Sequence, residues 1–121
     1  MILMMNPLIS TGLPTMDGVL SGGLRRGSFT VMGGTPGVGK STLLAQMACA
    51  MVTRGEDVLY VTAEETTAAI RARLSRVSGV TGVTILATAD LDEALREAQQ
   101  WKYSVVVIDS IQMMTTTTHP D

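Results

Sequence analysis

A glycine-rich segment near the start of the chain has the spacing of a phosphate-binding loop. The residues from Gly34 to Ser41 match G-x-x-x-x-G-K-[S/T], the P-loop. Its glycines let the backbone curl around phosphate with N–H groups pointing inward, and a following helix adds a favourable dipole. Lys40 would reach the β- and γ-phosphates, and the Ser41 hydroxyl would ligate Mg²⁺. We expect ATP to be bound by nine consecutive residues: Gly34, Thr35, Pro36, Gly37, Val38, Gly39, Lys40, Ser41 and Thr42.

The residues around this motif favour a working P-loop over an ordinary glycine-rich turn. The preceding run, about Ser28–Gly33, is apolar enough for a buried strand, and the following run, Lys40–Arg54, has helical apolar spacing. Gly55 then provides a helix stop. Strand, loop and helix in this order are the context that the motif requires.

Carboxylates follow two further apolar runs. Asp109 ends the aliphatic run Val105–Ile108, the Walker B pattern, where it would hold Mg²⁺ with Ser41. The alternative is a strand-ending turn aspartate. Glu64 follows the run Val58–Thr62 and could orient the attacking water, acting as the catalytic carboxylate alongside Lys40. Glu65 competes for that role, although we favour Glu64. Both could instead be solvated at a helix start.

Composition limits the remaining function classes. The 121 residues suffice for one domain, with 45% apolar and 17% charged residues. A net charge of −2 argues against a basic surface over the whole chain for nucleic acid or membranes. No apolar run approaches the ~20 residues that span a bilayer, and the N-terminus lacks signal-peptide features, so we expect a cytoplasmic protein. The single cysteine, Cys49, is expected to be a buried small hydrophobe.

Alternating elements predict the fold class. Helices are expected at about 15–20, 40–54, 66–77 and 90–101, and strands at 28–33, 58–62, 83–86 and 104–108. Such alternation predicts an α/β fold in three layers, with a mostly parallel sheet covered on both faces. We divide the chain into an N-terminal lead-in segment (1–27), a nucleotide-binding core (28–114) and a disordered tail (115–121).

Arginines are concentrated on the helix predicted at 66–77. Arg71, Arg73 and Arg76 are best explained by a solvated helix face. Contact with phosphate or with a partner is the alternative. The pattern by itself does not favour a binding site.

Several segments together resemble the RecA-like P-loop ATPases, and most of all a bacterial DNA-repair branch of that family. Beyond the P-loop itself, the resemblance covers about residues 9–114. The matching segments are Ser10–Asp17, Leu20–Leu24, Gly27–Ser28, Val58–Glu65 and Val106–Gln112.

The resemblance implies roles that composition alone does not give. Lys40 and Ser41 would bind nucleotide and Mg²⁺, Glu64 would be the catalytic carboxylate and Asp109 the Walker B acid. The family works as homo-oligomeric rings or filaments with ATP between subunits and single-stranded DNA in the channel. The DNA-repair branch assists recombination by processing branched DNA.

Some family features are not found in this sequence. They include a zinc ribbon, DNA-binding loops after Walker B and the sensor strand that lies beside the Walker B strand. We therefore expect either a chain that is truncated after Walker B, with a sheet incomplete at its C-terminal side, or a sheet that is rearranged or completed by another chain. A nucleotide-binding module without turnover and a KaiC-type signalling ATPase remain alternatives. A small P-loop kinase is disfavoured by the Ser-Thr-Gly lead-in.

Overall fold

A computed structural model of the chain describes residues 8–25, 40–78, 82–109 and 114–116. The strand predicted at 28–33 and the loop residues Gly34–Gly39 lie outside the described residues. The described elements occur in the order β1 (Leu8–Ile9), α1 (Pro14–Val19), β2 (Leu24–Arg25), α2 (Lys40–Thr53), β3 (Val58–Thr62), α3 (Thr67–Ser78), β4 (Thr84–Ala87), α4 (Leu91–Gln100) and β5 (Val105–Asp109).

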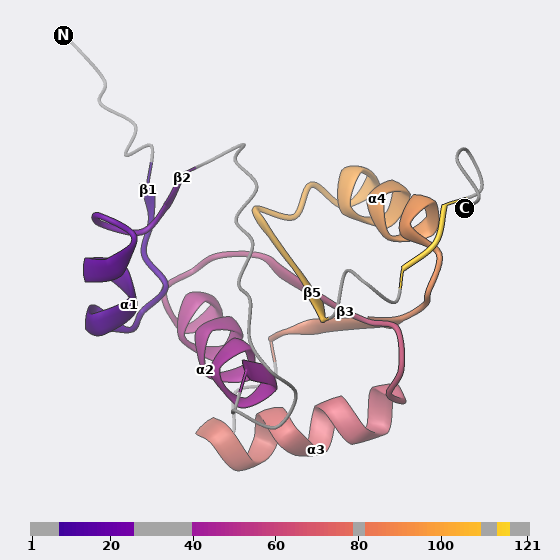
Figure 1. The fold of residues 1–121 in the computed structure, drawn as a ribbon, viewed down its shortest axis with the longest axis horizontal. Coiled ribbons are helices and arrows are strands. Elements are labelled where there is room, and N and C mark those ends of the chain that lie inside the picture. The colour runs from indigo at the N-terminus through magenta and orange to yellow at the C-terminus, as the bar shows by residue number, and fades with distance from the viewer. Residues whose placement is uncertain (1–7, 26–39, 79–81, 110–113, 117–121) are drawn as a thin grey trace, which may run out of the picture.

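A parallel sheet lies at the centre of the fold. Its strand order is β4-β3-β5, and β3 pairs in parallel with both neighbours. All five residues of β3 are buried, since the strand is covered on both faces. Figure 1 shows α2 and α3 on one side of the sheet and α4 on the other. The predicted three-layer α/β fold with a parallel sheet is thereby confirmed.

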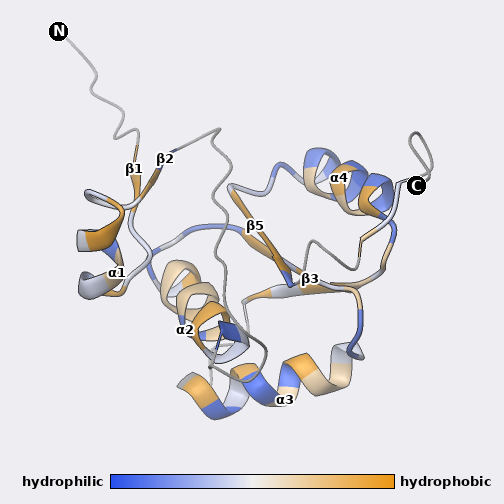
Figure 2. Ribbon diagram, in the orientation of Figure 1, coloured by the Kyte–Doolittle hydropathy of each residue, from blue (hydrophilic) through white to orange (hydrophobic). Residues whose placement is uncertain are grey.

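The two faces of β3 belong to different parts of the core. Val58 and Tyr60 pack in a cluster with residues of α2 and α3, whereas Leu59 and Val61 pack with Ala94 of α4. This division follows from the two-residue period of a strand. Figure 2 shows the apolar character of β3 and β5 beside the largely hydrophilic α4. Because the sheet is held from both sides, its strand ends are fixed in position.

Local signals explain where the main helices begin and end. Gly55, at φ 94°, ends α2 by donating its N–H to Val52 O while Glu56 donates to Met51 O, a Schellman arrangement. Thr66 caps α3 by accepting from Ala69 N at 3.1 Å, and Asp90 caps α4 by accepting from Asp92 N at 3.0 Å.

The lead-in segment forms a small unit that packs on α2. Its strands β1 and β2 pair antiparallel, and α1 lies between them in sequence. Gly12, at φ 78°, lies against α2 so closely that an added Cβ would be 2.4 Å from the Cβ of Ala50. Glycine is required here both by the backbone conformation and by the close approach. The lead-in is therefore fastened to the helix that begins with Lys40.

Two further predictions concern Cys49 and the tail. Cys49 is buried in the core between α2 and α3, as expected. Thr115, from the segment expected to be disordered, donates its N–H to Ala89 O at 2.7 Å and accepts from Leu91 N at 2.7 Å. The part of the tail that the structure describes is thus paired with the start of α4.

Candidate functional site

The N-terminus of α2 and the carboxyl ends of β3 and β5 meet at one edge of the sheet. Thr62 and Asp109, the last residues of β3 and β5, are register partners. Lys40 and Ser41 are the first two residues of α2. Ligands of open α/β sheets bind outside the carboxyl ends of the strands, where a helix N-terminus also favours anions. The fold therefore brings the chemistry-bearing residues to the expected edge.

Asp109 contacts both α2 residues. Its Oδ2 accepts a hydrogen bond from Ser41 Oγ at 2.6 Å, and its Oδ1 lies 4.0 Å from Lys40 Nζ. The side chains of Lys40 and Asp109 are 23% and 11% exposed, so both remain accessible from solvent. Residues that are 68 positions apart in the sequence are thus joined directly. Thr42, the other α2 residue predicted to bind nucleotide, is exposed.

A polar pocket of about 180 Å³ opens beside this contact. Five residues line it, and they come from the start of α2, the end of β3 with the turn that follows, and the end of β5. These residues are Ser41, Thr62, Glu64, Glu65 and Asp109.

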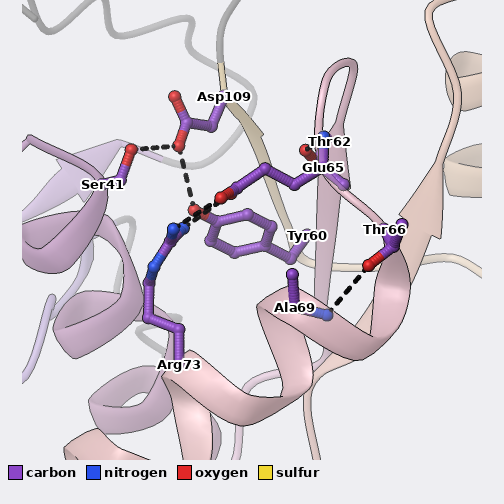
Figure 3. A network of polar contacts seen from close by, with 8 residues as sticks. All are labelled: Ser41, Tyr60, Thr62, Glu65, Thr66, Ala69, Arg73 and Asp109. Carbon is purple, nitrogen blue, oxygen red and sulfur yellow. Dashed lines mark hydrogen bonds and ion pairs between the residues drawn. The ribbon is translucent and has the colours of Figure 1, made fainter.

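The two glutamates of the pocket differ in their partners. Glu65 forms a bidentate ion pair with Arg73 of α3, with nitrogen–oxygen distances of 2.8 and 2.7 Å (Figure 3). Hydrogen bonding to Glu65 is the main cause that raises the pKa of Arg73. Glu64 is exposed and makes no such contact with the described residues. Among the described residues, Glu64 therefore has no side-chain partner, whereas both oxygens of Glu65 are engaged.

The arginines of α3 agree in part with the expected solvated helix face. Arg71 and Arg76 are exposed, although Arg71 also donates to Val83 O at 3.0 Å. Arg73 differs, because it is partly buried and pairs with Glu65. Helical periodicity could not reveal these contacts, because their partners lie 8 and 12 residues away.

The oxygen donors at the site suit magnesium, and the lysine suits phosphate. Mg²⁺ is held by one or two protein oxygens together with substrate phosphates and water. Ser41 Oγ and the Asp109 carboxylate supply such oxygens, and Lys40 supplies a cation at the helix start. In the described parts of the chain, no group of three or more His, Cys, Asp or Glu residues is placed to hold a metal ion together.

Comparison with known proteins agrees with this geometry. The model of the family described as "ATPase: KaiC" matches residues 9–88, which span the lead-in, α2, β3, α3 and β4. The chain belongs to this KaiC-type family of RecA-like P-loop ATPases. The resemblance inferred from the motifs is confirmed.

Relatives of this KaiC-type ATPase are named DNA repair protein RadA. The protein from Mycolicibacterium smegmatis is 45% identical over 109 residues, which cover 88% of this chain and 23% of that protein. The Campylobacter jejuni protein is 42% identical over 106 residues, covering 87% and 24%, and the Rickettsia bellii protein is 41% identical over 111 residues, covering 89% and 25%. The chain thus spans about a quarter of the length of these relatives.

Sequence reasoning missed one residue of this polar site, Tyr60. Its hydroxyl donates to Asp109 Oδ2 at 3.2 Å, while the residue itself is fully buried. Burial is the largest cause that raises the pKa of Tyr60, and the negative charge of Asp109 adds to it. A signal was present: alternation puts Tyr60 on the same face of β3 as Thr62, and that face is covered by the P-loop helix.

Proposed function

We propose that this chain binds ATP with Mg²⁺ and hydrolyses it. The observation that carries the proposal is the meeting of Lys40, Ser41 and Asp109, with Ser41 Oγ 2.6 Å from one Asp109 oxygen and Lys40 Nζ 4.0 Å from the other. Lys40 would hold the β- and γ-phosphates at the start of α2. Ser41 and Asp109 would hold Mg²⁺, which neutralises phosphate charge when bound. The nucleotide-binding role extends to the loop residues 34–39 by motif alone.

Hydrolysis needs a group that orients water, and we assign it to Glu64. Water attacks the γ-phosphorus as the bond to the bridging oxygen of ADP breaks, and the water's proton passes to the carboxylate or to phosphate. Glu64 lines the same pocket as Ser41 and Asp109 and has no side-chain bond among the described residues. The bidentate pair with Arg73 supports a different role for Glu65, since both of its oxygens are already engaged.

The competing proposal is a module that binds nucleotide without turning it over. Release of inorganic phosphate and binding of a fluorescent ATP analogue, measured on the purified chain with Mg²⁺, separate the two. We expect Glu64→Gln to keep binding and to slow release by about 100-fold, the scale of general-base catalysis. Glu65→Gln is the matched control and should release phosphate at close to the original rate.

The outcomes of this experiment are distinct. Binding without phosphate release in the unmodified chain would support the module and overturn hydrolysis. Loss of release in Glu65→Gln with little change in Glu64→Gln would show that the catalytic carboxylate is wrongly assigned.

We further propose that the ATPase acts in DNA repair and recombination, as a homo-oligomer that engages single-stranded or branched DNA. The names of the relatives support the repair role, although they describe much longer proteins. With a net charge of −2, DNA contact would need a local basic patch and not the whole surface. Fluorescence anisotropy of labelled single-stranded and forked DNA, with and without Mg·ATP, tests this role. Size-exclusion chromatography tests whether the chain assembles into oligomers. The absence of ATP-dependent binding to either DNA would contradict the proposed role in DNA repair.

A further inference from the structure

We infer that Tyr60 is a positioning residue for the proposed metal carboxylate, and that its hydroxyl fixes the orientation of Asp109. This inference rests on the proposed Mg·ATP function and adds a residue to that site. Figure 3 shows the Tyr60 hydroxyl and the Ser41 hydroxyl reaching the same Asp109 oxygen. The distances to Oδ2 are 3.2 Å from Tyr60 and 2.6 Å from Ser41.

The two Asp109 oxygens are therefore used differently. Oδ2 accepts both hydroxyls, whereas Oδ1 lies 4.0 Å from Lys40 Nζ. A carboxylate held at one oxygen from two directions cannot rotate freely about its terminal bond. Oδ1 consequently stays on the side of the ammonium group, where phosphate and metal would bind. Hydrogen-bonding partners of metal ligands commonly orient those ligands in this way.

Tyr60 can hold this position because its own ring is fixed. It lies in the middle of β3, has no exposed surface and packs in the core cluster with α2 and α3. In the parallel pairing, Tyr60 is opposite Val107 and Thr62 is opposite Asp109, so the phenol reaches one diagonal step along the sheet. The hydroxyl must find a partner when the ring is buried, and Asp109 provides it.

Apart from Asp109, the charged groups beside the Tyr60 hydroxyl are paired with each other. Arg73 and Glu65 form their bidentate pair beside the ring, as Figure 3 shows. The packed ring and its strand hold the Tyr60–Asp109 bond in place.

The test uses Tyr60→Phe, which keeps the ring and removes only the oxygen. Binding of a fluorescent ATP analogue is measured as Mg²⁺ is varied and again in excess EDTA. We expect the Mg²⁺ concentration for half-maximal binding to rise by about tenfold, the lower range for loss of a partner of a metal ligand. Affinity in EDTA should not change.

Tyr103→Phe is the matched control. The chain has two tyrosines, and Tyr103 packs on the opposite face of the sheet with the α4 cluster. This variant should keep both the Mg²⁺ midpoint and the affinity in EDTA. A merely structural effect of losing a tyrosine oxygen would instead be shared by the two variants.

A double variant separates positioning from a general loss of packing. In Asp109→Asn, adding Tyr60→Phe should leave the Mg²⁺ dependence as it is, because the hydroxyl acts through the carboxylate. Three results would each overturn the inference. They are an unchanged Mg²⁺ midpoint in Tyr60→Phe, an equal loss of affinity with and without Mg²⁺, and a further loss of Mg²⁺ dependence in the double variant. In all three cases the original chain still binds Mg·ATP, whereas absent Mg²⁺-dependent binding in that chain would overturn the proposed function as well.

Discussion

Two aspartates in this chain accept hydrogen bonds from hydroxyl groups, yet they differ in what they leave available. Asp17 of the lead-in accepts from Ser10 Oγ at 2.5 Å, from Thr11 Oγ1 at 2.6 Å and from Thr11 N at 2.8 Å. Asp109 accepts from Ser41 and Tyr60, which lie 68 and 49 residues away in sequence. The Asp17 network lies within residues 10–17, whereas the Asp109 network joins α2, β3 and β5.

The difference lies in what remains available on each carboxylate. Both oxygens of Asp17 accept hydrogen bonds from neutral groups, and the hydroxyls of Ser10 and then Thr11 are the main causes that lower its pKa. Asp109 keeps one oxygen on the side of Lys40, beside the pocket. A saturated carboxylate stabilises structure, and a partly saturated one can take a ligand. We infer that Asp17 secures the lead-in and that Asp109 serves the site.

The lead-in network also has a structural consequence for the site. Gly12 follows Thr11 and lies directly against Ala50 of α2. Asp17 is hydrogen-bonded to Thr11, the neighbour of Gly12, so it also stabilises the surface against which α2 packs. The local network therefore supports the helix whose first residues form the nonlocal one.

The largest effect is expected at the site. Lys40→Ala removes the cation beside Asp109 and should weaken ATP binding by about 10- to 100-fold, the range for hydrogen bonds to charged groups. The denaturation midpoint should change little, because the ammonium is partly exposed. Titration of a fluorescent ATP analogue measures the affinity. Lys102→Ala, at the chain's other lysine, is the control and should bind normally. Equal losses in both variants would contradict a specific role of Lys40 in binding ATP.

The next effect is expected in the lead-in. Asp17→Ala leaves the fully buried Thr11 without its main hydrogen-bond acceptor, which should cost about 1–3 kcal/mol of unfolding free energy. Urea denaturation followed by circular dichroism measures it. Asp57→Ala serves as the control, because Asp57 is exposed and bonds to Ser104 through its backbone. A stability loss in Asp57→Ala as large as that in Asp17→Ala would show that the network is not responsible.

The smallest effect is a dependence on pH. Because the pKa of Asp17 is lowered from 3.8 on folding, its stabilisation is complete above that value and is lost as pH falls through the folded pKa. The stability advantage of the original chain over Asp17→Asn should thus persist from pH 7 to about pH 4 and shrink below it. Urea midpoints of both proteins between pH 7 and pH 3 measure the difference. An advantage that vanishes well above pH 4 would contradict the proposed role of the carboxylate.

The sequence predicted the parts that depend on local pattern. Apolar runs and caps placed α2, β3 and β5 within one residue of their observed bounds, and the strand-end position of Asp109 followed from them. The contact between Asp109 and Ser41 could be expected only from the P-loop and Walker B motifs, which place both residues at one Mg²⁺ site. Tyr60 and the Glu65–Arg73 pair were missed. Alternation along β3 gives the face on which Tyr60 lies, but periodicity does not reveal which side chain on another element a residue contacts.

The most direct test of the central claim compares the original chain with Asp109→Asn in the presence and absence of Mg²⁺. Calorimetric titration with a non-hydrolysable ATP analogue gives the gain in affinity that Mg²⁺ provides. We predict a clear gain in the original chain, loss of most of it in Asp109→Asn, and affinities in EDTA that are no weaker in the variant. The same Mg²⁺-dependent gain in both proteins would contradict a metal-nucleotide site formed by Ser41 and Asp109.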